Sequence, residues 1–259
     1  MHTHTGFSDD CDHTFDEMVA AAAETNLEGI AITDHYDPGY PDPEFPFTID
    51  FPAYQAAMEK KQRELEGRLE IIKGVEIGIM DSELQAAHDL AASYDYDFII
   101  GSFHCLRNQA LDLIDYSQLD RSAVTRDFYS YMYDMLKKFK DYDVIGHYTI
   151  IDRYIGGIFD LDPSMDIIRE TLKMIIEDGK GIEINTSSYK YNMPVGLPRI
   201  QILEAYRELG GEILTIGSDS HEPERYGSHF DKALAIARGV GFKYYCSYKN
   251  REPVFHRFY

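Results

Sequence analysis

Short apolar runs that each end in a metal-ligand side chain recur along the 259-residue chain and constrain its fold most strongly. At the N-terminus, His2 and His4 are two residues apart. Side chains at that spacing share one face of a strand, so we predict two imidazoles side by side. Five later segments end in the same way: Asp34-His35, Glu76, His104, His147 and Asp219-Ser220-His221. Because chance would not produce six such endings in succession, we interpret the set as the metal site of a hydrolase.

These apolar runs alternate with helical patterns along the chain. Strands are predicted to start near His2, Gly29, Ile71, Phe98, Val144, Ile182 and Ile213. Strands that alternate with helices predict a parallel sheet. An open sheet could not bring the ends of all its strands to one site, whereas a closed barrel gathers its carboxyl ends on one face. No break in composition and no internal repeat divides the chain, so we predict a single domain.

Local signals define several helices. Thr14 and Glu17 form the capping-box pattern before a helix that runs to about Asn26. Asp162-Pro163 predicts an N-cap followed by proline at the first helical position. Further helices are expected over residues 50–67, 82–93, 121–140 and 198–209. Large apolar side chains recur every three or four residues in the 121–140 helix, which indicates a core-facing surface.

Two segments fit neither element type. Residues 36–49 are rich in proline and aromatic residues and predict a long irregular loop, which we interpret either as a lid or as a packed connector. The tyrosine-rich tail from Phe242 predicts a closing strand pair or an interface.

The charge balance excludes some partners. The formal net charge is −20, from 25 Lys and Arg against 45 Asp and Glu. Such a surface repels nucleic acid, whose binding requires cations against the phosphates, so we predict no nucleic-acid partner. A small phosphate substrate stays compatible with this charge, because bound metal can invert the local field.

Cysteine use and hydropathy bear on the compartment. Cys11, Cys105 and Cys246 are odd in number and widely spaced, which argues against disulfides and favours a reducing environment. The N-terminus carries no signal-peptide pattern, and no apolar run approaches the length of a membrane span. We therefore predict a cytoplasmic protein without a membrane partner.

The ligand types and their number limit the metal chemistry. Imidazole and carboxylate together suit Zn, Fe or Mn, and their number predicts two or three divalent ions with a bridging carboxylate. Asp34 is a candidate for a residue that contacts the ligands without binding the ion itself. His13 is either an alternative ligand to Asp10 or a solvated loop residue. The other histidines are interpreted as surface, packing or helix-cap residues: His88, His229 and His256. Without a nucleophile elbow, a P-loop or a catalytic-cysteine setting, a metal-held hydroxide is the expected nucleophile.

Taken in order, these motifs resemble the polymerase and histidinol phosphatase (PHP) family. The motifs that carry the resemblance are His2-Thr3-His4-Thr5, Thr33-Asp34-His35, Gly74-Val75-Glu76, Gly101-Ser102-Phe103-His104, Gly146-His147 and Gly217-Ser218-Asp219-Ser220-His221. Three stretches resemble its histidinol-phosphate phosphatase branch: 143–154 (DVIGHYTIIDRY), 181–191 (GIEINTSSYKY) and 210–221. Two departures are Thr149, where Asp is common, and Lys190, where Arg is frequent.

The resemblance implies a PHP-type metal-dependent phosphoesterase domain over residues 1–259, folded as a distorted (β/α)7, TIM-like barrel with a trinuclear site. One ion would take His2, His4, Glu76 and Asp219. A second would share Glu76 and add His104 and His147. The third would use Asp10, His35 and His221, with Asp9 as the alternative to Asp10.

The resemblance also implies a phosphoric monoester hydrolase, a histidinol-phosphatase of histidine biosynthesis. It would convert L-histidinol phosphate and water to L-histidinol and phosphate by attack of a metal-bridging hydroxide. Arg153 and Lys190 are the expected phosphate contacts, with plain surface charges as the alternative. Acidic and aromatic residues within 36–47 and 189–191 suit a cationic amine and an imidazole.

Two rival hypotheses stay open. One is a nucleotide or other small phosphate-ester phosphatase, or a nuclease, with the same site. The other is a metal-binding regulatory module without enzymatic activity.

Overall fold

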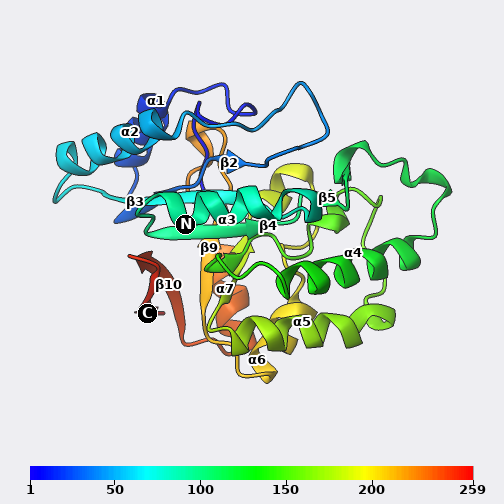
Figure 1. Cartoon of the computed structure of the whole chain (residues 1–259). Helices are drawn as coiled ribbons and strands as arrows, with labels where there is room; N and C mark the ends of the chain where they lie inside the picture. The colour runs from blue at the N-terminus through cyan, green and yellow to red at the C-terminus, as the bar shows by residue number, and fades with distance from the viewer. Residues whose placement is uncertain (259) are drawn as a thin grey trace.

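The computed structural model describes residues 1–258 and contains a curled parallel sheet with helices packed around its outside (Figure 1). The strands lie in chain order around the sheet: β1 (Gly29–Ile32), β3 (Glu70–Gly78), β4 (Phe98–Ser102), β7 (Val144–Ile145), β8 (Gly181–Asn185) and β9 (Leu214–Gly217). The short strand β2 (His35–Tyr36) continues beyond β1 and pairs with β3. Neighbouring strands in this order run parallel, as expected for strands joined by helical crossovers.

The N-terminal segment closes this sheet into a ring. On one side, Thr3 O accepts from Thr33 N at 2.9 Å; on the other, His4 N donates to Ser220 O at 2.9 Å. The predicted first strand is nevertheless wrong, because the segment forms a single isolated bridge, Thr3 with Ser220. Pairing stops there because Thr5 N donates to the Asp34 side chain at 2.6 Å rather than to a backbone carbonyl. With this segment as the seventh position, the predicted distorted (β/α)7, TIM-like barrel is confirmed.

Seven helices surround the described part of the barrel: α1 (Phe15–Ala23), α2 (Phe51–Glu64), α3 (Leu84–Ser93), α4 (Arg121–Leu136), α5 (Met165–Glu177), α6 (Ile200–Glu208) and α7 (Phe230–Val240). The capping box at α1 is confirmed, with Thr14 and Glu17 exchanging side chain–backbone hydrogen bonds. The N-cap prediction at Asp162 is wrong. Residues Asp162–Ser164 form a separate 3₁₀ turn, and α5 starts after it at Met165. None of the described helices is long and apolar enough to cross a membrane.

The sequence pattern of α4 places its apolar stripe in the core. Phe128, Met132 and Leu136 are almost fully buried, between the barrel wall and α5. In the barrel wall, successive side chains of β3 point alternately outward and inward, as in any strand between two packed layers. Val75 and Ile77 pack outward in this core, whereas Ile72 belongs to the separate cluster inside the barrel. The barrel is therefore packed both inside and outside.

The tail forms the predicted strand pair, an antiparallel hairpin of β10 (Tyr244–Lys249) and β11 (Glu252–Arg257). Cys246 and Tyr248 pack inside the barrel near the amino ends of the strands, and the Tyr248 ring lies 4.8 Å from that of Phe98. Arg251, in the hairpin turn, donates from Nε to Oδ2 of the buried Asp143 at 2.6 Å. The hairpin thus closes the end of the barrel opposite the ligand-bearing strand ends.

We predict that Arg251→Ala lowers the free energy of unfolding by about 2 to 4 kcal/mol, because it leaves the buried Asp143 carboxylate without its nearest cation. Arg257→Ala, which removes an exposed arginine from the same hairpin, should change it by less than about 0.5 kcal/mol. Urea denaturation of both variants measures the difference. Equal stabilities would show that the ion pair does not anchor the hairpin.

Candidate metal centre

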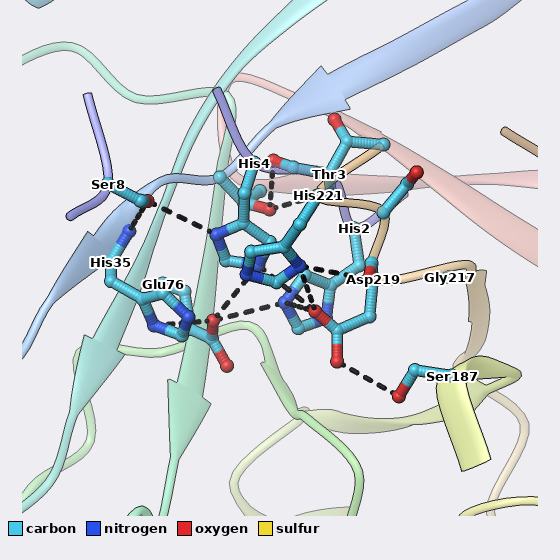
Figure 2. A network of polar contacts seen from close by, with 12 residues as sticks. His2, Thr3, His4, Ser8, His35, Glu76, Ser187, Gly217, Asp219 and His221 are labelled. Atoms are coloured by element: carbon cyan, nitrogen blue, oxygen red, sulfur yellow. Dashed lines mark hydrogen bonds and ion pairs between the residues drawn. The ribbon is translucent and has the colours of Figure 1, made fainter. Parts of the chain in front are cut away.

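The Glu76 carboxylate lies at the centre of a cluster of imidazoles at the carboxyl ends of the strands (Figure 2). It is fully buried, and β3 points it into the barrel. Five histidines reach its two oxygens: His35 and His147 at 3.0 Å, His2 at 3.1 Å, His104 at 3.3 Å and His4 at 3.4 Å. The register of β2 with β3 pairs His35 with Glu76, so these two residues lie at the same level of the barrel.

A first group of ligand atoms combines the N-terminal pair with the last strand. His4 Nε2 lies 3.2 Å and His2 Nε2 lies 3.7 Å from Asp219 Oδ1, and both also face Glu76 Oε2. Asp219 follows β9 with a positive φ of 51°, a conformation that few residues other than glycine adopt. Its other oxygen accepts hydrogen bonds from Ser187 and Asn185.

A second group lies on the other side of Glu76. The Nε2 atoms of His104 and His147 are 3.4 Å apart, and both face Glu76 Oε1. His147 also has a positive φ, of 23°. The two imidazoles come from the ends of neighbouring strands, β4 and β7, so the barrel itself sets their separation.

A third group lies nearer the surface. Asp10 Oδ2 is 3.0 Å from His221 Nε2 and 3.6 Å from His35 Nε2. The alternative, Asp9, accepts a hydrogen bond from Phe47 N at 2.6 Å and so holds the loop over residues 36–49. The geometry therefore favours Asp10. All nine predicted ligands lie in one cluster.

The electrostatics of the cluster call for positive charge. Burial lowers the pKa of His2, but Glu183, Glu76 and Asp219 outweigh it and raise the pKa well above its ordinary value. At His35, burial also lowers the pKa, but the charges of Glu76 and Asp10 outweigh it and raise the pKa to about 9. At His4, burial, reinforced by His221 and His35, lowers the pKa to about 3. Without metal, protons on some imidazoles must balance the carboxylates.

The donor set fits divalent ions. No described Lys or Arg forms an ion pair with Glu76 or Asp219; their charged partners are histidines. His4 Nε2 and His221 Nε2 are buried without a hydrogen-bond partner, and each faces a carboxylate oxygen. Three sets of ligand atoms in the described chain lie close enough to share an ion: His4, His35 and His221; His2, His4 and Glu76; His35, Glu76 and His104. Unpartnered lone pairs beside unbalanced carboxylates are typical of transition-metal sites.

Sequence reasoning missed two buried carboxylates behind the ligands. Asp37 Oδ1 lies 2.7 Å from His104 Nδ1, and Glu183 Oε1 lies 2.8 Å from His2 Nδ1. A charge inside the otherwise apolar strand of residues 181–185 was an available signal for Glu183. Asp34, the predicted option behind the ligands, accepts hydrogen bonds from Thr5 and Ser8, and Ser8 in turn contacts His4 Nδ1 at 3.3 Å.

A pocket of about 310 Å³ opens onto this cluster. The side chains that line it include both predicted phosphate contacts and an aromatic rim: Tyr40, Phe45, Phe47, Arg153, Tyr154, Lys190 and Tyr191. A larger hollow, of about 810 Å³, lies at the opposite end near Lys249, and it contains none of the predicted ligands.

The two predicted phosphate contacts differ in their surroundings. Arg153 donates from Nη2 to Ser187 Oγ at 2.8 Å, and its guanidinium lies 4.2 Å from the centre of the Tyr191 ring. Its Nε is buried without a hydrogen-bond partner, and Asp219 is the carboxylate whose charge acts on it, without a direct ion pair. Lys190, by contrast, is bonded to Glu222 at 2.7 Å.

His88, His229 and His256 occupy the surface, packing and helix-cap positions that the sequence indicated. His88 bonds Asp141 at the surface and His256 contacts Ser247 in the hairpin. His229 is the N-cap residue of α7, without a side-chain capping bond. The three cysteines are buried and free.

The fold and the cluster define a class: a TIM-like barrel with imidazoles and carboxylates gathered at one end of its strands. The family model described as "PHP domain" matches residues 1–187, and the chain belongs to this family. A probable histidinol-phosphatase of Clostridium acetobutylicum is 32% identical, over 93% of each chain. A histidinol-phosphatase of Lactococcus lactis is 26% identical, over 93% of this chain and 90% of its own.

A solved structure shares the fold. The crystal structure of histidinol phosphate phosphatase from Lactococcus lactis, complexed with zinc, L-histidinol and phosphate, superposes with a TM-score of 0.86. The two chains are 24% identical, and the match covers 98% of this chain and 97% of the other. The likeness spans the whole barrel, including the hairpin end.

We predict that the metal-free protein loses stability as the pH rises from 6.5 to 9.5. The His35 pKa is raised from 6.5 to about 9 on folding, so its contribution is complete below pH 6.5 and lost as the pH rises through 9. The loss from this residue is at most about 3 kcal/mol. Denaturation in a chelator at each pH measures it, and His35→Gln should flatten the slope. A metal-free protein equally stable at both ends would contradict the assignment.

Proposed function

We propose that this chain is a metal-dependent phosphate-monoester hydrolase whose substrate is histidinol phosphate, which it converts with water to L-histidinol and phosphate. Relatives named as histidinol-phosphatases along nearly the whole chain support this substrate. The observation that carries the reaction class is the Arg153 guanidinium, which forms no ion pair, in a pocket lined by six of the nine metal-ligand side chains.

Two or three divalent transition-metal ions, Zn, Fe or Mn, would occupy the three groups described above. His2, His4, Glu76 and Asp219 would hold one ion; Glu76, His104 and His147 a second; Asp10, His35 and His221 a third. Six carboxylates are gathered in and behind the cluster: Asp10, Asp34, Asp37, Glu76, Glu183 and Asp219. Three divalent ions would neutralise them. Bound ions of this kind lower the pKa of water and offset phosphoryl charge.

Arg153 is the residue best placed to hold the phosphate. A partly buried guanidinium that forms no ion pair is unfavourable, so a ligand anion in the pocket would stabilise it. Its planar group can donate two parallel hydrogen bonds to phosphate oxygens. The Tyr191 ring and Ser187 Oγ fix its direction. Lys190 would add a second cation at the rim after giving up Glu222.

The rim of the pocket suits the rest of the substrate. Tyr40, Phe45 and Tyr191 offer aromatic faces to an imidazole or a cationic amine. Asp112, an exposed carboxylate that accepts a hydrogen bond from Tyr40 at 3.0 Å, lies on the same wall and would attract the amine. The volume of about 310 Å³ fits a small phosphate ester, consistent with a net charge of −20 that disfavours long nucleic acid.

The whole chain, residues 1–259, would form one such domain. The family model ends at residue 187, but two ligands, Asp219 and His221, come from beyond it, and the final hairpin fills the barrel interior. Three buried free cysteines support a reducing, cytoplasmic location.

Arg153→Ala should lower kcat/KM for the phosphate ester by about 30- to 1,000-fold, because a charged hydrogen-bonding partner of the phosphate is lost. Arg153→Lys should recover part of the loss by restoring the charge without the fork. Arg169→Ala, an exposed arginine on α5, is the matched control and should leave kcat/KM unchanged. If Arg153→Ala stays within about twofold of the wild type, its role in phosphate binding is wrong.

Steady-state kinetics on a panel of esters test the substrate. We expect kcat/KM for histidinol phosphate to exceed that for mononucleotides, sugar phosphates and an aryl phosphate by at least about tenfold, or 1.4 kcal/mol. A chelator should abolish turnover, and added Zn, Fe or Mn should restore it. A smaller preference for histidinol phosphate would indicate a phosphatase of broader specificity. No turnover of any ester by metal-loaded protein would favour the regulatory module.

A further inference from the structure

Two of the six clustered imidazoles have a buried carboxylate directly behind them. His2 directs Nδ1 to Glu183 at 2.8 Å and Nε2 to Glu76 at 3.1 Å. His104 directs Nδ1 to Asp37 at 2.7 Å and Nε2 to Glu76 at 3.3 Å. The two imidazoles therefore have the same arrangement on opposite sides of Glu76: one nitrogen faces the centre, and the other an outer carboxylate.

Neither outer carboxylate is shared with a lysine or arginine in the described chain. Glu183 contacts His2 through Oε1 and accepts hydrogen bonds at Oε2 from two amide groups, His147 N and Asn185 Nδ2, each at 3.0 Å. Asp37 has His104 as its near partner and His35 Nδ1 at 3.5 Å. Both side chains are nearly inaccessible to solvent, at 0% for Glu183 and 4% for Asp37. Among the charged side chains of the described residues, their close partners are thus the imidazoles of the cluster, and the Met1 amino group adds a further positive charge near Glu183.

The backbone leaves room for both carboxylates. A Cβ on Gly78 would overlap the Asp37 carboxylate, and one on Gly217 would overlap that of Glu183. Each of these glycines ends a strand beside the cluster, β3 and β9 respectively. Two strand ends thus lack a side chain where an outer carboxylate lies, so both carboxylates are built into the barrel rather than placed by chance contact.

An outer carboxylate determines what its imidazole can do. When Nδ1–H donates to the carboxylate, the lone pair is on Nε2 and points to the centre, and the ring cannot turn away. The other four rings lack an outer carboxylate of their own at Nδ1. His4 Nδ1 contacts Ser8 Oγ, His221 Nδ1 contacts a backbone carbonyl, and His147 Nδ1 has no hydrogen bond. His35 Nδ1 faces the central Glu76 at 3.0 Å, with Asp37 farther away at 3.5 Å.

We propose that Glu183 and Asp37 are positioning residues that each secure a different ion. Glu183 fixes His2 for the ion of His2, His4, Glu76 and Asp219, and Asp37 fixes His104 for the ion of Glu76, His104 and His147. In the third group, around Asp10, His221 Nδ1 contacts a backbone carbonyl instead of an outer carboxylate, and His35 Nδ1 lies nearer to Glu76, at 3.0 Å, than to Asp37, at 3.5 Å. This inference rests on the proposed metal centre and adds that one ion depends on Glu183 and another on Asp37.

Metal binding by the isosteric variants Glu183→Gln and Asp37→Asn tests the proposal without relying on activity. Each is loaded with Zn²⁺ and titrated with a competing chelator, and the released ions are counted. Each variant should bind one ion 10- to 100-fold more weakly than the wild type, and the double variant should lose two ions. Loading with Co²⁺ should change the visible absorption of one ion in each single variant.

Asp143→Asn is the matched control, because Asp143 is also buried but lies at the other end of the barrel, where it pairs with Arg251. It should lower stability and leave all metal affinities unchanged. Affinities within twofold of the wild type in both test variants would overturn the proposal. So would a double variant that loses a single ion, because the two carboxylates would then serve the same site.

A measurement on the wild type covers the case in which a variant fails to fold. The histidine ¹⁵N spectrum of the zinc-loaded protein should show His2 and His104 protonated at Nδ1 and bound through Nε2. The opposite tautomer at either residue would overturn its assignment. A wild-type chain that takes up no ion would overturn the proposed metal centre itself, whereas a loaded wild type with unaffected variants would overturn only the roles of Glu183 and Asp37.

Discussion

The structure depends on one buried carboxylate, Glu76, with five imidazoles within 3.4 Å. An unpaired charge in that position would cost several kcal/mol, so the fold must supply cations or protons around it. The barrel does so by bringing strand ends from residues 2 to 147 to one point. Stability and ligand arrangement therefore have the same physical origin, the burial of negative charge inside a ring of strands.

Two residues beside Glu76 show how the strand ends are adapted to this task. His147 and Asp219 both have positive φ, a region that residues other than glycine enter at a cost, although Asp and His do so more often than most. Hydrogen bonds hold the local backbone: His147 N donates to Glu183, and Asp219 N donates to His2 O. The turned backbone directs each side chain to the centre instead of along the strand. Strain at these two positions is consistent with a site whose geometry is imposed by its surroundings.

The two ends of the barrel have different roles. At the amino ends, Tyr248 and Cys246 of the hairpin fill the interior, and Arg251 pairs with Asp143. At the carboxyl ends, polar groups replace the apolar filling, and the pocket opens above them. A closed floor and an open top leave the cluster reachable from one side, where the unpaired Arg153 and the aromatic rim lie.

The sequence by itself determined the ligand types, the alternation of strands and helices, and the family resemblance, because these depend on spacing along the chain. It also indicated the capping box at Thr14 and the buried stripe of α4. It could not show that the first strand is a single bridge, since Asp34 ends the pairing from 29 residues away. Nor could it identify Asp37 and Glu183, whose roles come from contacts with His104 and His2 across the barrel. Only the tertiary structure decided these points, because closure of the ring determines which distant side chains meet.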